Sequence, residues 1–396
     1  MSTAGLPGDE LVELLRGLGV SEEEIGQARA DGVLTLLAID RLALGQELRY
    51  DVAAACDVTG LPAEELLHIW RSLGFPEPTP GEAVFSDVDL GNLAAMADLM
   101  HSGVVSPEVT YGMTRVIGSS MARIASALID AVSARGGAPR LETEEQQESV
   151  LEPIVSEADG FLPIFPGVLE QVWRRHLQVA ARRRLLRGDA EDGPGVVVGF
   201  ADLVGFTALA QQVSDEALAE VVDRFERLAY DVVVANGGRV VKMIGDEVMF
   251  VVDDPLRAAE VALGLSDASH DAAELSDVRV GMAIGPVVER EGDLFGVTVN
   301  LAARATSIAY PGTVVVSSEL RDALRGTPGL RFKSMRPRYL KNIGRVALSV
   351  VVHTDDPPGT IREVVEERRG QMRESLRGKL AARAGVGDEA DGSEEG

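Results

Sequence analysis

Phe200-Ala-Asp202-Leu-Val-Gly205-Phe-Thr207 is the stretch that decides the fold of the second half of this 396-residue chain. It overlaps the apolar run Val196–Phe200, which is typical of a short buried strand that ends at Asp202. The glycine-containing turn predicts a helix from about Gly205. The first backbone N–H groups of such a helix are free to bind an anion. A carboxylate beside such a turn suits a metal that bridges protein and phosphate, although a helix N-cap is an equally good explanation for this aspartate alone.

A second aspartate lies in a tight turn, Ile244-Gly245-Asp246, between two predicted strands at 240–243 and 247–252. Gly-Asp is common in turns for conformational reasons alone. If this hairpin lies beside the first strand, however, it brings Asp246 close to Asp202. The two carboxylates can then hold two divalent cations at one phosphate.

A third element is Asp293-Leu-Phe-Gly296-Val-Thr-Val-Asn300-Leu-Ala-Ala-Arg304, and it predicts a helix from Gly296 to Ile308. Asn300 and Arg304 are four residues apart, so they share one face of that helix. Arg304 offers a fixed cationic group suited to charge that develops on phosphate. A solvated helix face is the purely structural alternative for this pair.

Together the three elements resemble the class III nucleotidyl cyclases over about residues 192–355. The resemblance implies a ferredoxin-like α+β catalytic domain, with a central sheet flanked by helices, over 195–355. It implies two divalent cations per site, Mg²⁺ or Mn²⁺, bound by Asp202, Asp246 and the Leu203 carbonyl. It also implies that the turn binds phosphate through Val204, Gly205, Phe206 and Thr207. Lys341 is a further implied phosphate ligand, although it is followed by asparagine where the family usually has glycine.

The resemblance also implies the substrate and the reaction. Lys242 and Asp293 match the pair that reads adenine, Asn300 the residue that orients the ribose, and Arg304 the residue that stabilises the transition state. The implied function is an adenylate cyclase that converts ATP to 3′,5′-cyclic AMP and pyrophosphate. The alternatives are a guanylate cyclase, and a non-catalytic acidic regulator or transcription factor with a vestigial cyclase domain.

The same resemblance implies two copies of the chain. In the family, Lys242 and Asp246 belong to different half-sites although they are four residues apart. We therefore expect a head-to-tail homodimer with two shared sites and an inactive monomer. No general base is identified from the sequence.

Residues 1–158 predict an all-helical domain. The segment from Tyr50 to about residue 90 resembles a MerR-type helix-turn-helix, yet residues 1–150 hold nine arginines, no lysine and 24 acidic residues, a net charge of −15. Phosphate contacts dominate DNA affinity, so we expect no DNA binding. The domain also resembles the helical regulatory domains of soluble actinobacterial cyclases.

An Arg-rich helical linker is predicted over 159–194 and a polar, largely disordered tail over 356–396. The linker is either a solvated basic helix or a segment that sets the relative position of two catalytic domains. His176 lies among its arginines and offers one titratable group. A small molecule, a lipid or a proton is the expected kind of regulatory signal.

Composition limits the remaining function classes. A net charge of −25 argues against a nucleic acid or an anionic membrane as the main partner. The single cysteine, Cys56, excludes an internal disulfide and favours a cytoplasmic location. The first residues lack the basic region of a signal peptide, and no apolar run is long enough to span a membrane.

Overall fold

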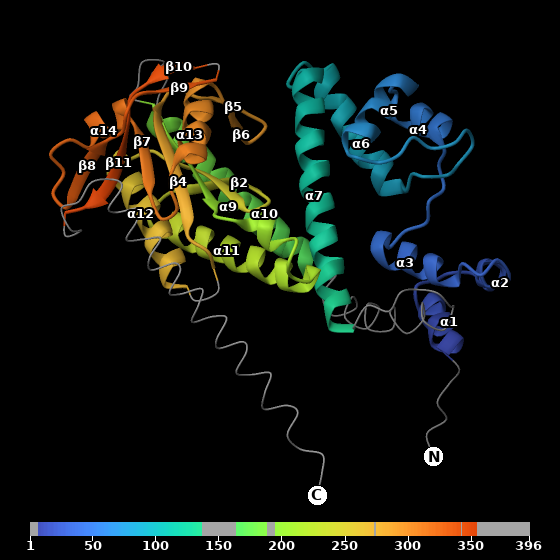
Figure 1. Ribbon diagram of the computed structural model, residues 1–396. Coiled ribbons are helices and arrows are strands. Elements are labelled where there is room, and N and C mark those ends of the chain that lie inside the picture. Colours follow the sequence, from blue (N-terminus) through green and yellow to red (C-terminus); the bar gives the residue numbers. More distant parts are fainter. Residues whose placement is uncertain (1–6, 137–163, 188–194, 273–274, 342, 355–396) are drawn as a thin grey trace, which may run out of the picture. The chain divides into compact units, whose positions relative to one another are not determined.

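The computed structural model describes residues 7–136, 164–187, 195–272, 275–341 and 343–354 (Figure 1). The chain divides into two compact units, residues 1–186 and residues 187–396. No helix in the described part of the chain is both long and apolar enough to cross a membrane. The tail over 356–396, which the sequence predicts to be disordered, lies outside the described residues.

The first unit is helical, as predicted. Its second helix is capped by Ser21, whose hydroxyl accepts a hydrogen bond from the Glu24 N–H at 3.2 Å. The helices of this unit are α1 (Pro7–Gly17), α2 (Glu22–Ala30), α3 (Leu34–Leu44), α4 (Val52–Thr59), α5 (Ala63–Ser72), α6 (Asp87–His101), α7 (Pro107–Gly136) and α9 (Phe165–Arg187).

The predicted helix-turn-helix element corresponds to α4 and α5. Gly60 ends α4 with a φ of +69°, a left-handed conformation that glycine adopts without strain. Phe85 is fully buried beside both helices, and its ring lies 4.8 Å from that of Trp70. A bridge between Tyr50 and Phe85 ties the chain before α4 to the chain before α6. The element is therefore a packed unit with its own small core.

Helix α7 approaches the end of α5 closely at Gly118. A Cβ atom added at Gly118 would lie 2.1 Å from the Leu73 carbonyl oxygen. Any side chain here would force the two helices apart.

The second unit is built around a seven-stranded sheet with the order β2-β3-β1-β4-β7-β11-β8. Neighbouring strands are antiparallel except β4 and β7, which are parallel. The strands of this sheet are β1 (Val196–Leu203), β2 (Arg239–Ile244), β3 (Glu247–Val252), β4 (Val278–Gly285), β7 (Val314–Ser317), β8 (Leu330–Ser334) and β11 (Leu348–His353). The helices are α10 (Phe206–Leu209), α11 (Asp215–Ala235), α12 (Pro255–Asp271), α13 (Val297–Ile308) and α14 (Ser318–Ala323).

Side chains of β1 alternate between two cores. Val197 and Leu203 belong to a core that β1 shares with α11, α12 and α14. Val198 and Phe200 belong to a second core on the opposite face of the sheet, which includes Ala302 of α13. Figure 1 shows α13 and α12 on the two sides of this sheet. Asp202 follows the alternation and therefore projects on the α13 face.

The predicted α+β fold is confirmed, but several elements differ in extent. The helix expected from Gly205 has only four residues, Phe206–Leu209. Two hairpins are missing from the sequence prediction because their strands have three residues each, too few to show an alternating pattern. They consist of β5 (Val288–Arg290) with β6 (Asp293–Phe295), and of β9 (Arg338–Leu340) with β10 (Gly344–Val346).

Candidate active site

Three charged side chains form a row across the end of the central strands. The sheet register pairs Asp202 of β1 with Glu247 of β3 on one side and with Arg279 of β4 on the other. Directly opposite residues in antiparallel strands project on the same face, so all three lie on the α13 face. Arg279 donates a hydrogen bond from Nε to Asp202 and forms an ion pair with the same carboxylate. The arginine therefore neutralises part of the acidic charge at this point.

Asp246 lies beside Asp202, as the sequence predicts. Ile244 pairs with Glu247, so β2 and β3 are joined by the two-residue turn Gly245-Asp246, with Gly245 at a φ of +63°. The Leu203 N–H donates a hydrogen bond to the Asp246 carbonyl at 3.1 Å, which ties the turn to the end of β1. The Asp202 carboxylate lies close enough to raise the pKa of Asp246. The β2–β3 hairpin thus places the Asp246 carboxylate near that of Asp202.

The carboxyl groups of Asp202, Asp246 and Glu247 repel one another. Burial raises the pKa of Asp246, and the nearby Asp202 carboxylate raises it further. Burial also raises the pKa of Glu247 to about 7, with added repulsion from Asp202 and Asp246. Arg279 acts in the opposite direction on both groups. A multivalent cation at this place would relieve the remaining repulsion.

The turn after β1 is held by backbone hydrogen bonds on two sides. Besides the bond from Leu203 to Asp246, the Val204 N–H donates to the Asp277 carbonyl at 2.9 Å. The predicted phosphate contact at Val204 would therefore compete with a hydrogen bond already made. The remaining predicted contacts of the turn are with Gly205, Phe206 and Thr207, at the start of α10.

Lys242 and Asp293 lie together, and they do so within one chain. Lys242 follows an irregularity in the pairing of β2 with β3, and its Nζ donates a hydrogen bond to Oδ2 of Asp293 at the start of β6. Burial acts to raise the pKa of Asp293, but this hydrogen bond and another from the Leu294 N–H lower it below its usual range. A donor and an acceptor are thus presented side by side.

Helix α13 carries Asn300 and Arg304, and both side chains are exposed. Two glycines of β4 let this helix lie close to the sheet. A Cβ added at Gly281 would lie 2.1 Å from the Thr306 backbone nitrogen, and one at Gly285 would lie 2.7 Å from the Thr298 hydroxyl. The positions of Asn300 and Arg304 therefore depend on residues beneath the helix.

Lys341 lies in the turn between β9 and β10, and it is exposed. The preceding Leu340 is buried in a core shared with β11, which anchors the hairpin. The hairpin is a two-stranded sheet of its own, separate from the strands that carry Asp202 and Asp246. Within one chain, Lys341 is therefore placed by a different element from the carboxylate pair.

Two family models match the chain. The model described as the adenylate and guanylate cyclase catalytic domain matches residues 189–353, and the model described as the adenylate cyclase regulatory domain matches residues 2–177. An adenylate cyclase of Streptomyces coelicolor is 37% identical over a match that covers 73% of this chain and 75% of that protein. The chain belongs to the class III cyclase family.

Further relatives cover both halves of this cyclase. An adenylate cyclase of Glutamicibacter nicotianae is 30% identical, with 74% of this chain and 75% of that protein matched. A pH-sensitive adenylate cyclase of Mycobacterium tuberculosis is 31% identical over 86% of each chain. The family, the catalytic fold and the helical regulatory half expected from the sequence are therefore confirmed.

The carboxylates of the cyclase site fit divalent cations that are shared with a substrate. No group of three or more His, Cys, Asp or Glu side chains in the described ranges is arranged as a self-sufficient metal site. Magnesium is commonly held by one or two carboxylates with substrate phosphates completing its shell. Asp202, Asp246 and the Leu203 carbonyl would supply that partial set of oxygen ligands, and the acidic crowding favours a cation.

Sequence reasoning missed two charged residues of this cyclase site, Glu247 and Arg279. Glu247 directly follows Asp246, and Arg279 interrupts the apolar strand Val278–Ile284, so both were visible as charges in otherwise buried strands. Their proximity to Asp202 comes from the strand order β3-β1-β4, which residue patterns alone do not give.

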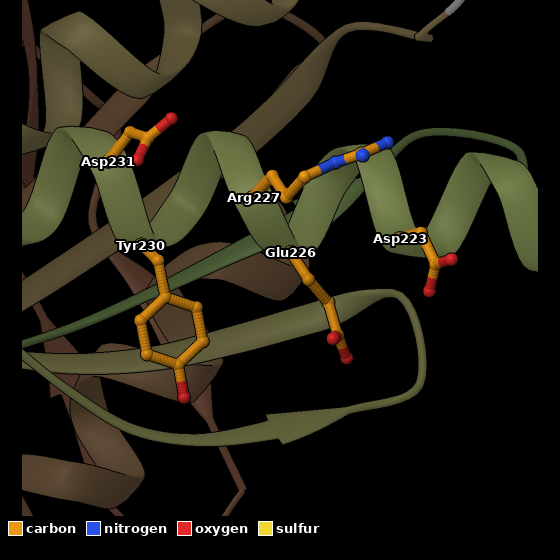
Figure 2. Close-up of a pocket in the computed structure, with 5 residues that line it drawn as sticks. All are labelled: Asp223, Glu226, Arg227, Tyr230 and Asp231. Atoms are coloured by element: carbon orange, nitrogen blue, oxygen red, sulfur yellow. The ribbon is translucent and has the colours of Figure 1, made fainter. Parts of the chain in front are cut away.

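A shallow hollow on α11 lies apart from these residues. Figure 2 shows the five side chains that line it on this one helix: Asp223, Glu226, Arg227, Tyr230 and Asp231. None of the predicted catalytic or metal-binding residues lines this hollow. Its mixed charges on a single helix face are typical of solvated surface.

Proposed function

We propose that this cyclase converts ATP to 3′,5′-cyclic AMP and pyrophosphate with two divalent cations at sites shared by two copies of the chain. The observation that carries the proposal is the Asp202–Asp246 carboxylate pair at the end of the central strands. The same chain also supplies an adjacent donor and acceptor, Lys242 and Asp293. Several relatives that match most of this chain carry the name adenylate cyclase.

Adenine is the base that suits the Lys242–Asp293 pair. Adenine presents an acceptor at N1 and a donor at its exocyclic amine, so Lys242 donates to N1 while Asp293 accepts from the amine. Guanine presents the two functions in the opposite order on the same edge. Both side chains are partly buried, which increases the cost of a mismatched polar contact.

The reaction is an in-line phosphoryl transfer within one nucleotide. The ribose 3′-oxygen forms a bond to the α-phosphorus, the bond from that phosphorus to the bridging oxygen breaks, and pyrophosphate leaves. The 3′-hydroxyl proton passes to solvent or substrate. Bound divalent cations acidify the 3′-hydroxyl and neutralise charge on the phosphates. Arg304 stabilises charge that develops at the phosphorus, and Asn300 orients the ribose.

The proposed site requires two chains in head-to-tail arrangement. One copy supplies Asp202 and Asp246, and its partner supplies Lys242, Asp293, Asn300 and Arg304. The elements near the second set carry exposed apolar side chains on β5, on β6 and at the start of α13. These are Val288, Phe295 and Val297, which are 63%, 50% and 71% exposed. Burial of such side chains against a second copy would favour association.

The deciding experiment supplies purified full-length protein with ATP and GTP in parallel, each with Mn²⁺ or Mg²⁺. We expect cyclic AMP from ATP and little or no cyclic GTP. Predominant cyclic GTP would assign a guanylate cyclase instead. Absence of any cyclic nucleotide between pH 5.5 and 8 would contradict catalysis and favour a non-catalytic regulator.

We also propose that the first unit regulates the second. The family model for residues 2–177 is described as a regulatory domain, and α9 carries four exposed arginines, Arg174, Arg175, Arg182 and Arg184, together with the exposed His176. Shared sites depend on the relative position of two catalytic domains, so a modest rearrangement would change activity. A proton, a lipid or another small molecule is the proposed signal, and DNA is not, because of the acidic charge of this unit.

A further inference from the structure

The segment between α12 and β4 is fastened to the last turns of α12 by two side chains. Ser269 is fully buried, and its Oγ donates a hydrogen bond to the Ser276 carbonyl at 2.6 Å. His270 Nδ1 lies 3.0 Å from Oδ1 of Asp277, and Asp277 is only 5% exposed. The helix therefore helps to hold Asp277, which directly precedes β4.

Asp277 reaches the candidate active site through its backbone. Its carbonyl accepts the hydrogen bond from the Val204 N–H at 2.9 Å, and Val204 is the second residue after Asp202. The preceding N–H, that of Leu203, is held by the Asp246 carbonyl. Together these bonds fix the two peptide groups that follow the metal-binding aspartate.

The contact with His270 matters because Asp277 is a buried carboxylate. In the described part of the chain, Asp277 Oδ2 is buried without a hydrogen-bond partner. His270 is the side-chain partner of the other carboxylate oxygen, Oδ1. A buried carboxylate that loses such a partner is strongly disfavoured. Without the imidazole, movement of Asp277 toward water would carry its carbonyl away from Val204.

We propose that His270 and Asp277 are positioning residues for the turn over residues 202–205. They touch no substrate atom in this proposal, and they act through the bond between the Asp277 carbonyl and the Val204 N–H. The inference rests on the proposed function, since it assigns a role within the same site.

The first test measures amide hydrogen exchange in full-length protein. His270→Ala removes the partner of Asp277, whereas His270→Asn keeps a side-chain donor near the position of Nδ1. His353→Ala is the matched control, because His353 pairs with Asp267 at 3.4 Å and both side chains are half exposed. We expect about tenfold faster exchange over residues 203–205 in His270→Ala, and wild-type exchange in the other two variants.

The second test measures Mn²⁺ binding by electron paramagnetic resonance, with a non-reactive ATP analogue present. Loss of a residue that supports a metal site typically weakens metal binding by about 10- to 100-fold. We expect about tenfold weaker Mn²⁺ binding and a lower kcat for His270→Ala, with KM for ATP at saturating Mn²⁺ within about twofold of wild type. His270→Asn should recover most of both losses.

Several outcomes would overturn the proposal. Wild-type exchange over 203–205 and wild-type Mn²⁺ binding in His270→Ala would do so, whatever the thermal stability. Equal effects in His353→Ala would mean that loss of His270 acts only through the overall stability of the protein, which would also overturn the proposal. Faster exchange and weaker Mn²⁺ binding in a protein that makes no cyclic nucleotide would support the positioning role while the proposed reaction fails.

Discussion

At the scale of single residues, the acidic cluster is the feature with the clearest consequences. Asp202, Asp246 and Glu247 lie on adjacent strands and their turn, and Arg279 is the cation that the structure places against them. Such crowding costs stability in the absence of metal, and the proposed cations would offset that cost. Glu247 should contribute to the pH dependence of stability, because the pKa of its largely buried carboxyl is raised to about 7.

Without metal, the free energy of unfolding should fall as pH rises from about 4.5 to about 7. Glu247 is protonated in both states below its ordinary pKa of 4.5; above it, the unfolded chain releases the proton while the folded chain retains it until about 7. Asp246 contributes with the same sign, since its pKa is also raised. Urea unfolding in EDTA at pH 5 and pH 7 measures the fall, and Glu247→Gln should make it smaller. An unchanged or larger fall in that variant would contradict the assignment.

Base preference should depend on the two residues of the Lys242–Asp293 pair. The class III resemblance indicates that guanylate-type members carry Glu and Cys or similar residues at these positions. Lys242→Glu combined with Asp293→Cys should lower kcat/KM for ATP by at least about 100-fold and raise that for GTP, because a wrongly paired buried donor or acceptor is costly. Parallel assays with both nucleotides measure the ratio. A double variant that kept the wild-type ratio would show that the base is read elsewhere.

At the scale of elements, the height of α13 above the sheet should control activity. Gly281→Val places a side chain against the Thr306 backbone, so α13 must move, at a cost of about 1–3 kcal/mol or more. We expect lower thermal stability and a loss of kcat, since Asn300 and Arg304 move with the helix. Gly264→Ala on α12 is the control, because its added Cβ meets one methyl group of Val232 at 3.2 Å. Equal loss of kcat in both variants would argue against control through α13.

The sequence predicted those elements that have long, one-sided patterns. The buried strand ending at Asp202, the Gly245-Asp246 turn and the helix with Asn300 and Arg304 all lie where their patterns indicated. Three-residue strands carry no readable period, so both small hairpins were missed. The contact of Asp202 with Arg279 was missed for another reason: it depends on the pairing of β1 with β4, which are 77 residues apart at this point. Such long-range pairing leaves no local mark in the sequence.

At the scale of the whole molecule, complementation between two defective chains should reveal shared sites. Asp202→Ala and Arg304→Ala should each reduce turnover by at least about 1,000-fold without unfolding the chain. The first removes a proposed cation ligand, and the second removes a positive charge that stabilises the transition state. In a mixed dimer, one site receives Asp202 from one chain and Arg304 from the other, so mixing should restore activity. Analytical ultracentrifugation provides the control for dimer formation. Mixed dimers without activity would contradict sharing.

The regulatory half should change the activity of the catalytic half. We expect full-length protein and a fragment of residues 187–396, the second compact unit, to differ in kcat or in response between pH 5.5 and 8. The same comparison with added fatty acids tests a lipid signal. Circular dichroism of the fragment confirms that it is folded. Identical activity and identical responses in both proteins would remove the case for regulation.

The β2–β3 hairpin gives the proposed dimer an unusual genetic property. Its short span carries Lys242 for one site and Asp246 for the other. A lesion in either residue alone spares one site in a dimer with a normal chain, but loss of the whole hairpin damages both. An allele that deletes the hairpin and still dimerises would therefore be dominant, because every dimer that contains its product would be silent.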